Sequence, residues 1–132
     1  MLIAGTTGIG KTVCVNAIII GLLYSRTPDE LKFVMVDTKM VEMAIYNRIP
    51  HMLTPVVTDV RKAAHAINWV VQEMEKRYRL LAKVGVRNIA TFNAREVSIS
   101  DQAQLADASQ GSENVIPAKL PYIVVVIDEL AD

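Results

Sequence analysis

The amino-acid sequence predicts an α/β fold built around a mainly parallel β-sheet. Two short apolar runs rich in valine and isoleucine, residues 33–36 and 122–127, are separated by segments with helical periodicity. The second run is apolar at nearly every position, as expected for a strand covered on both faces. Strands of this kind that alternate with helices are typical of parallel sheets.

Local signals place the elements of the first half of the chain. Residues 1–4 are apolar and predict a strand, and residues 11–24 are apolar on nearly every face and predict a buried helix. Residues 27–30, with threonine, proline and two acids, predict a helix start of about one turn. After the strand at 33–36, we expect a short helix at 40–46.

In the second half, residues 49–58 contain two prolines and predict an ordered connector. A long helix should follow, capped by Thr58 or Asp59, because apolar residues then recur at steps of three and four. Gly85 is the expected end of this helix, and Trp69 is expected in the core. The polar segment 98–111 is expected to be a surface excursion.

The composition indicates one domain at most. The chain has 132 residues, of which 52% are hydrophobic, and its 14 basic residues balance 14 acidic ones. This balance argues against strong nucleic-acid binding by this segment alone. The single cysteine, Cys14, fits a reducing cytoplasm and is expected to be buried. The longest apolar run, 13–24, is too short to cross a bilayer, so we expect no membrane contact by this segment.

Residues 5–12 match the pattern Gly-x-x-x-x-Gly-Lys-Thr in full. This P-loop consists of Gly5, Thr6, Thr7, Gly8, Ile9, Gly10, Lys11 and Thr12. Its glycines let backbone N–H groups point at phosphate oxygens, and the helix that follows offers its positive end to the same anion. Lys11 is expected to contact the β- and γ-phosphates, and the Thr12 hydroxyl to ligate Mg²⁺. We therefore predict that the whole loop binds nucleotide.

An acidic pair, Asp128-Glu129, follows the strand at 122–127. Asp128 is expected to hold Mg²⁺ together with Thr12, and Glu129 to orient and deprotonate the attacking water. The predicted catalytic residues are therefore Glu129 and Lys11. A carboxylate dedicated to proton transfer indicates hydrolysis rather than binding alone. The guanine signature Asn-Lys-x-Asp does not occur, so ATP is favoured over GTP.

The position of Glu129 also predicts the order of the strands. P-loop enzymes with a glutamate beside the magnesium-binding aspartate resemble one another in belonging to the RecA-like, additional-strand type of P-loop NTPase. In that group a strand from later in the sequence lies between the P-loop strand and the Asp-Glu strand. We therefore expect residues 1–4 to have no native neighbour on the side that faces 122–127.

The sequence leaves the roles of two further residues open. Asp37 and Lys39 follow the strand at 33–36, and the carboxyl ends of strands face the ligand in such sheets. Either charge lies near the phosphates, or both belong to a solvated loop. The two histidines, His51 and His65, lack the spacing of metal ligands.

The chain resembles the motor domain of the FtsK/SpoIIIE family over most of its length. Beyond the P-loop, the similar segments are 35–40, 49–59, 73–78, 85–88, 120–125 and 128–132. The connector 49–59 is the most specific of them. Ile9 and Thr12 stand where the family usually has serines, and Thr38 replaces a usual proline.

The resemblance implies a homo-hexameric ring that hydrolyses ATP with Mg²⁺ and pulls double-stranded DNA through its centre, in chromosome segregation at cell division or sporulation. Residues 1–132 would be a partial motor domain, incomplete at both ends and inactive alone. The motor domain is expected in the cytoplasm, and a membrane anchor elsewhere in the parent protein stays open. Two alternatives also stay open: a conjugative or secretion-type ATPase that moves another polymer, and a non-hydrolysing nucleotide-binding module.

Overall fold

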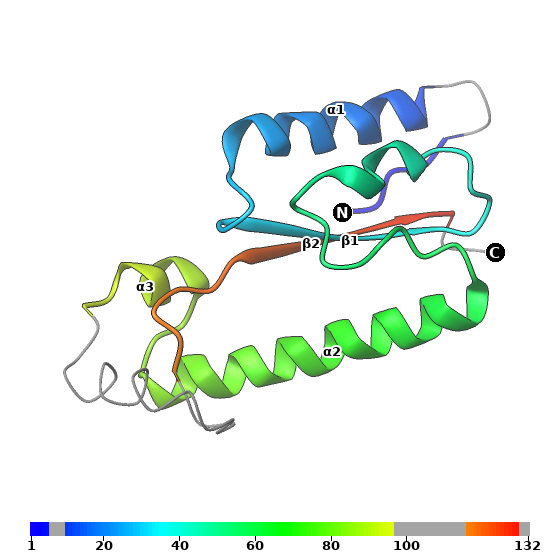
Figure 1. Cartoon of the computed structure of the whole chain (residues 1–132). Helices are drawn as coiled ribbons and strands as arrows, with labels where there is room; N and C mark the ends of the chain where they lie inside the picture. The colour runs from blue at the N-terminus through cyan, green and yellow to red at the C-terminus, as the bar shows by residue number, and fades with distance from the viewer. Residues whose placement is uncertain (6–9, 97–115, 130–132) are drawn as a thin grey trace. The chain divides into compact units, whose positions relative to one another are not determined.

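A computed structural model describes residues 1–5, 10–96 and 116–129. In chain order its elements are helix α1 (Lys11–Ser25), strand β1 (Leu31–Asp37), 3₁₀ helix η1 (Ala44–Arg48), helix α2 (Val60–Lys83), helix α3 (Ile89–Ala94) and strand β2 (Tyr122–Asp128), as Figure 1 shows. The chain divides into two compact units, the first formed by Met1–Ala64 with Ile123–Asp132 and the second by His65–Tyr122. The polar segment expected on the surface, 98–111, lies outside the described residues.

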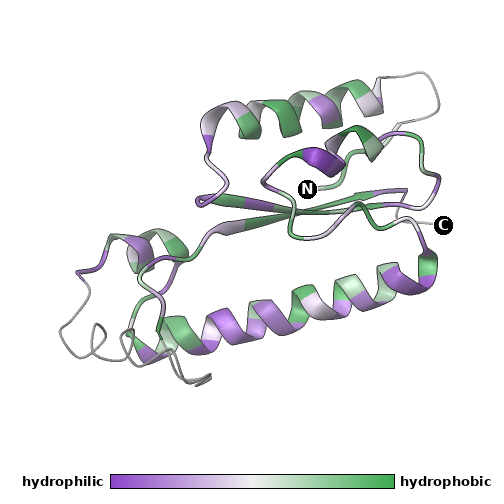
Figure 2. Cartoon of the chain, viewed as in Figure 1, coloured by the Kyte–Doolittle hydropathy of each residue, from purple (hydrophilic) through white to green (hydrophobic). Residues whose placement is uncertain are grey.

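The sheet of the first unit confirms the predicted α/β class. β1 and β2 are hydrogen-bonded neighbours that run parallel and end at the same edge (Figure 1). Both strands are hydrophobic along most of their length (Figure 2). β1 is buried at every position except the half-buried Lys32. The expectation that β2 is covered on both faces is wrong for the described residues, because its positions after the exposed Tyr122 are only half-buried.

The connector after η1 lies along the other edge of β1. The backbone N–H of Phe33 donates to the carbonyl of His51 (2.8 Å), and the N–H of Val57 donates to the carbonyl of Met35 (2.9 Å). Isolated parallel bridges join Phe33 to Met52 and Val36 to Val57. β1 is therefore paired on both edges, and the connector is ordered, as its prolines predicted.

Helix α1 packs on this sheet through one face. Ile19 is its buried residue, and it belongs to a core with Phe33 and Met35 of β1. The expectation of a helix buried on nearly every face is wrong, as is the expectation for Cys14, which is exposed. The described elements of this unit cover one side of α1, so its other apolar side chains, such as Val13, face outward.

Residues 1–4 do not form the predicted strand. They have no regular structure, and Met1 and Leu2 are 99% and 83% exposed. Among the described residues, β2 has β1 as its only strand neighbour. A pocket of about 500 Å³ is lined by residues 1–3, the apolar residues of β2 and the inner face of α1. A strand needs a partner for its N–H and C=O groups, and among the described residues no strand pairs with residues 1–4.

The second unit is held together around Phe92 of α3. Phe92 is fully buried with Leu81, Ile116 and Leu120. The guanidinium of Arg95 lies 3.7 Å from the centre of the Phe92 ring and donates to the carbonyls of Pro117 and Ala118. Helix α3 was not expected from the sequence, although its N-cap, Asn88, accepts from the N–H of Thr91 (2.8 Å).

Helix α2 has the predicted ends. The Asp59 carboxylate accepts from the N–H groups of Arg61 (2.8 Å) and Lys62 (3.2 Å) at its start, and Gly85 follows its end with φ +72°. Hydrophilic and hydrophobic residues alternate along it (Figure 2). The expectation of a core position for Trp69 is wrong among the described residues, since its side chain is 43% exposed. None of the described helices is both long and apolar enough to cross a membrane.

Alanine substitutions at two glycines test the backbone conformations described above. Gly85 has the left-handed conformation that a side chain disfavours, so Gly85→Ala should lower the free energy of unfolding by about 1–2 kcal/mol. Gly21 lies within α1 with open space around its Cα, so Gly21→Ala should raise it by about 0.5–1 kcal/mol. Urea unfolding of a soluble protein that contains this chain measures both, and effects of the same sign would contradict the assigned backbone.

Candidate nucleotide-binding site

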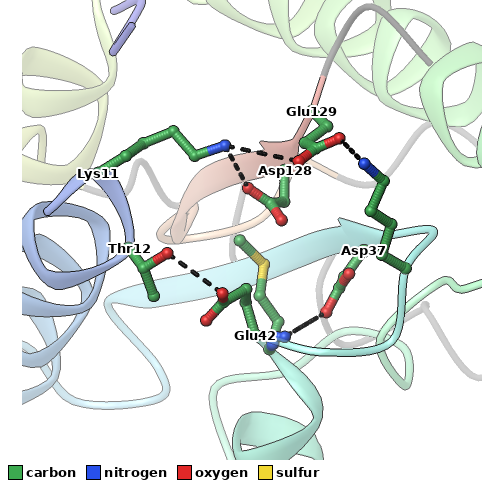
Figure 3. Close-up of polar contacts among 8 residues, drawn as sticks. Lys11, Thr12, Asp37, Glu42, Asp128 and Glu129 are labelled. Atoms are coloured by element: carbon green, nitrogen blue, oxygen red, sulfur yellow. Dashed lines mark hydrogen bonds and ion pairs between the residues drawn. The ribbon is translucent and has the colours of Figure 1, made fainter. Parts of the chain in front are cut away.

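The start of α1 and the end of β2 bring the predicted catalytic residues together. The Lys11 ammonium lies 3.4 Å from Oδ1 of Asp128 and 4.0 Å from Oε1 of Glu129. Figure 3 shows these side chains converging across the carboxyl edge of the sheet. The three residues also line one end of the pocket beside β2. Two motifs far apart in the sequence thus form a single charged site.

The N-terminus of α1 has the features of an anion site. Gly10 is its N-cap and adopts the left-handed conformation (φ 87°), which favours glycine at this position of the loop. No side chain caps the helix, and its first turn contains no acidic residue. The positive end of the helix therefore remains available to an external anion. Gly5 is described and exposed, whereas the other predicted phosphate-binding positions, 6–9, lie outside the described residues.

The predicted Mg²⁺ ligands are Thr12 and Asp128. Thr12 is the second residue of α1, directly after Lys11, whose ammonium contacts Asp128. No group of three or more histidine, cysteine or acidic residues suited to a metal occurs among the described residues. Mg²⁺ usually keeps several waters and takes one or two protein ligands together with phosphate oxygens. One hydroxyl and one carboxylate therefore fit Mg²⁺ bound with a nucleotide.

Asp37 organises the loop that follows β1. Its side chain is 0% exposed, and its Oδ2 accepts from the N–H groups of Glu42 (2.9 Å) and Met43 (3.0 Å). Burial raises the pKa of this carboxyl, but backbone hydrogen bonds from Met43, Glu42, Met40 and Lys39 outweigh burial and hold the pKa below its ordinary value. Asp37 thus stabilises the loop that follows β1. The sequence alone had left its role open.

Lys39 projects from this loop to Glu129. The Lys39 ammonium forms an ion pair with Oε2 of Glu129, while Lys11 lies nearer Oε1. Both oxygens of the predicted general base therefore face a lysine. Glu129 also has a positive φ of 55°, an uncommon conformation for a residue with a side chain, and such strain is concentrated at functional sites. The sequence left open the roles of Asp37 and Lys39, and of these two residues Lys39 is the one whose charge lies at the site.

The sequence reasoning missed one residue of the site, Glu42. The Thr12 hydroxyl donates to its Oε1 (3.2 Å), a contact that Figure 3 shows. The only sequence signal was an acidic residue shortly after a strand whose carboxyl end faces the ligand edge.

Helix α1 and the parallel strands form an α/β fold with a charged site at the carboxyl edge of its sheet, and comparison with known proteins identifies the class of protein. The FtsK/SpoIIIE family model matches residues 1–132, so the chain belongs to the FtsK/SpoIIIE family. It is 53% identical to DNA translocase FtsK 1 of Neisseria meningitidis serogroup A and 54% identical to DNA translocase FtsK of Streptococcus pneumoniae. Both alignments cover 100% of this chain, but only 17% and 16% of those relatives.

The buried Asp37 carboxylate predicts a defined dependence of stability on pH. Its pKa is lowered in the folded protein, so its contribution is present above the ordinary aspartate pKa of about 3.9 and is lost as the pH falls through the folded value. Asp37→Asn should therefore cost about 1–3 kcal/mol at pH 7, and the variant should converge with the wild type in acid.

Urea unfolding across this pH range measures the difference, and the same change at the exposed Asp29 is the matched control. A cost for Asp37→Asn that stays constant down to the lowest pH would contradict the assigned role of the charge.

Proposed function

We propose that this chain forms the ATP-binding and ATP-hydrolysing segment of a motor that translocates double-stranded DNA. The observation that carries the proposal is the convergence of Lys11 with Asp128 and Glu129 at the carboxyl edge of a parallel sheet. A cation for the phosphates, a carboxylate for the metal and a second carboxylate for the water are the groups that this chemistry needs. Membership of the FtsK/SpoIIIE family supports the same function.

We also propose the RecA-like, additional-strand order of P-loop NTPases for this fold. In this arrangement a further strand lies between residues 1–4 and β2. The pocket beside these two segments supports the proposal, because it is lined by apolar residues of β2 and α1, and β2 has no second strand neighbour in the part of the chain that the structure describes. Neighbouring strands lie about 4.8 Å apart, so one extra strand requires a gap of roughly 10 Å.

The site residues have separate tasks in this proposal. Lys11 leaves the carboxylates and contacts the β- and γ-phosphates, while the P-loop backbone holds the anion at the start of α1. Thr12 and Asp128 hold Mg²⁺, which neutralises charge on the phosphate oxygens. Glu129 accepts a proton from the attacking water through a carboxylate oxygen. Lys39 keeps Glu129 at the edge of the site after Lys11 has moved to the phosphates.

The activity of the whole protein is part of the proposal, since the chain spans about one sixth of the length of the relatives it matches. We propose a homo-hexameric ring in the cytoplasm that acts on double-stranded DNA in chromosome segregation. The two relatives named above are DNA translocases by name, which supports this partner. Residues supplied by a neighbouring subunit contribute about 10³–10⁵ in rate in related chemistry, so this segment alone should be inactive.

Two substitutions in the complete motor test the assignment of roles. Lys11→Ala should abolish ATP binding, because it removes the charge that faces the phosphates. Glu129→Gln should retain ATP binding but lose about 10²–10⁴ in hydrolysis rate, because an amide cannot accept the proton of the water. Equilibrium binding of a fluorescent ATP analogue and phosphate release measure the two effects. Glu75→Gln, on the exposed surface of α2, is the control, and equal loss of binding in both site variants would refute the roles.

The mode of DNA binding gives a second test. A motor that moves over any sequence must contact phosphates rather than base edges. Binding by the assembled motor should therefore weaken steeply between low and moderate salt and vary little among DNA sequences. Fluorescence anisotropy with duplexes of unrelated sequence at several salt concentrations measures this. Tight binding to one sequence at moderate salt would overturn the proposal.

A further inference from the structure

Glu42 reaches the P-loop from a different part of the sheet. It lies in the loop after β1, whereas Thr12 lies in the first turn of α1. The Thr12 hydroxyl donates to Oε1 of Glu42 over 3.2 Å, and both side chains are half-buried. Among the described residues the Glu42 carboxylate forms no ion pair, in contrast to Asp128 and Glu129. Its partner is the hydroxyl of the predicted metal ligand.

The protein holds Glu42 in this place through its backbone. The N–H of Glu42 donates to the buried Asp37 carboxylate (2.9 Å), and the N–H of the next residue, Met43, donates to the same oxygen (3.0 Å). Met43 itself is buried in the core of the first unit. The position of the Glu42 side chain is therefore defined by the end of β1 rather than by a mobile surface segment.

The direction of this hydrogen bond matters for metal binding. A threonine hydroxyl has one proton to donate and two lone pairs that accept hydrogen bonds or ligate cations. When the proton points at a carboxylate, the lone pairs point elsewhere and remain available to a cation. Groups that orient a metal ligand in this way commonly change metal affinity by about 10–100-fold when they are removed.

We propose that Glu42 is a positioning residue that orients the Thr12 hydroxyl for Mg²⁺. The inference rests on the proposed nucleotide site. Glu42 accepts the hydrogen bond of the hydroxyl, and Thr12 presents the lone pairs of its oxygen to the metal. Asp37 in turn fixes the backbone of Glu42, so the end of β1 takes part in forming the metal site without contacting the metal.

The test is the Mg²⁺ dependence of nucleotide binding by the complete motor. Binding of a fluorescent ATP analogue is titrated with Mg²⁺ for the wild type, Glu42→Ala and Glu42→Gln. Glu42→Ala should raise the Mg²⁺ concentration at half-saturation by about 10-fold, while binding of the analogue in EDTA stays unchanged. Glu42→Gln keeps an oxygen that can accept the hydrogen bond of the hydroxyl, and it should raise the half-saturating Mg²⁺ concentration less than Glu42→Ala does. Glu75→Gln on α2 is the matched control.

A double-mutant cycle with Thr12→Ala isolates the pair. If Glu42 acts through the hydroxyl, Glu42→Ala should have no further effect on the Mg²⁺ dependence once Thr12 is alanine. A full additional shift would mean that Glu42 acts on the metal directly, and would overturn the inference. An equal loss of binding with and without Mg²⁺ would indicate a merely structural role and would overturn it as well, as would equal shifts for Glu42→Gln and Glu42→Ala.

The outcomes also separate this inference from the proposed function. If the wild-type motor shows no Mg²⁺-dependent binding of ATP, the nucleotide site itself is refuted. If the wild type binds as expected and Glu42→Ala matches it, only the role of Glu42 is refuted.

Discussion

The parallel pairing of β1 with β2 is the constraint on which the site depends. Because the strands run in the same direction, their carboxyl ends lie at one edge, and the residues that follow each strand meet there. β2 brings Asp128 and Glu129 to this edge, and β1 brings the loop with Lys39 and Glu42. The start of α1 is anchored above the same edge by the packing of Ile19 on β1. An antiparallel pairing of these strands would place their two carboxyl ends at opposite edges of the sheet.

The loop after β1 places charged side chains at this edge of the sheet. A buried carboxylate such as Asp37 is costly unless it accepts hydrogen bonds, and here the N–H groups of Glu42 and Met43 donate to one of its two oxygens, Oδ2. The same bonds that stabilise the charge also fix the path of the loop. Its two charged side chains then contact other groups of the site, Lys39 the Glu129 carboxylate and Glu42 the Thr12 hydroxyl. One buried charge therefore positions groups on both sides of the candidate site.

The sequence was sufficient for features that depend on local patterns. The place of the acidic pair at the end of an apolar strand and the ends of α2 at Asp59 and Gly85 follow from short spacings, and the α/β class follows from the alternation of strands and helices. The sequence was insufficient for features that tertiary contacts determine. Cys14 lies in an apolar helix, but its exposure depends on which face the sheet covers. Residues 1–4 have the composition of a strand, but a strand also requires a partner.

Glu42 was missed for the same kind of reason. An acidic residue in a loop is usually solvated, and the approach of Glu42 to Thr12 depends on tertiary contacts, the packing of α1 on β1 and the hydrogen bonds of the loop to Asp37. Likewise, the sequence left the roles of Asp37 and Lys39 open because both follow the same strand. Burial separates them, since one carboxylate turns inward to the backbone and one ammonium turns outward to Glu129.

The charges of the site explain how a bound ligand could rearrange the ion pairs of the site. Two lysines, Lys11 and Lys39, face two carboxylates, Asp128 and Glu129, so the four groups nearly neutralise one another without a ligand. These ion pairs are partly exposed and therefore individually weak. In the proposed function a triphosphate, with more negative charge than a single carboxylate, would compete for Lys11. Its arrival would release Asp128 for a metal and one oxygen of Glu129 for a water, while Lys39 keeps the other. The weakness of these ion pairs is thus what allows the ligand itself to assemble the site.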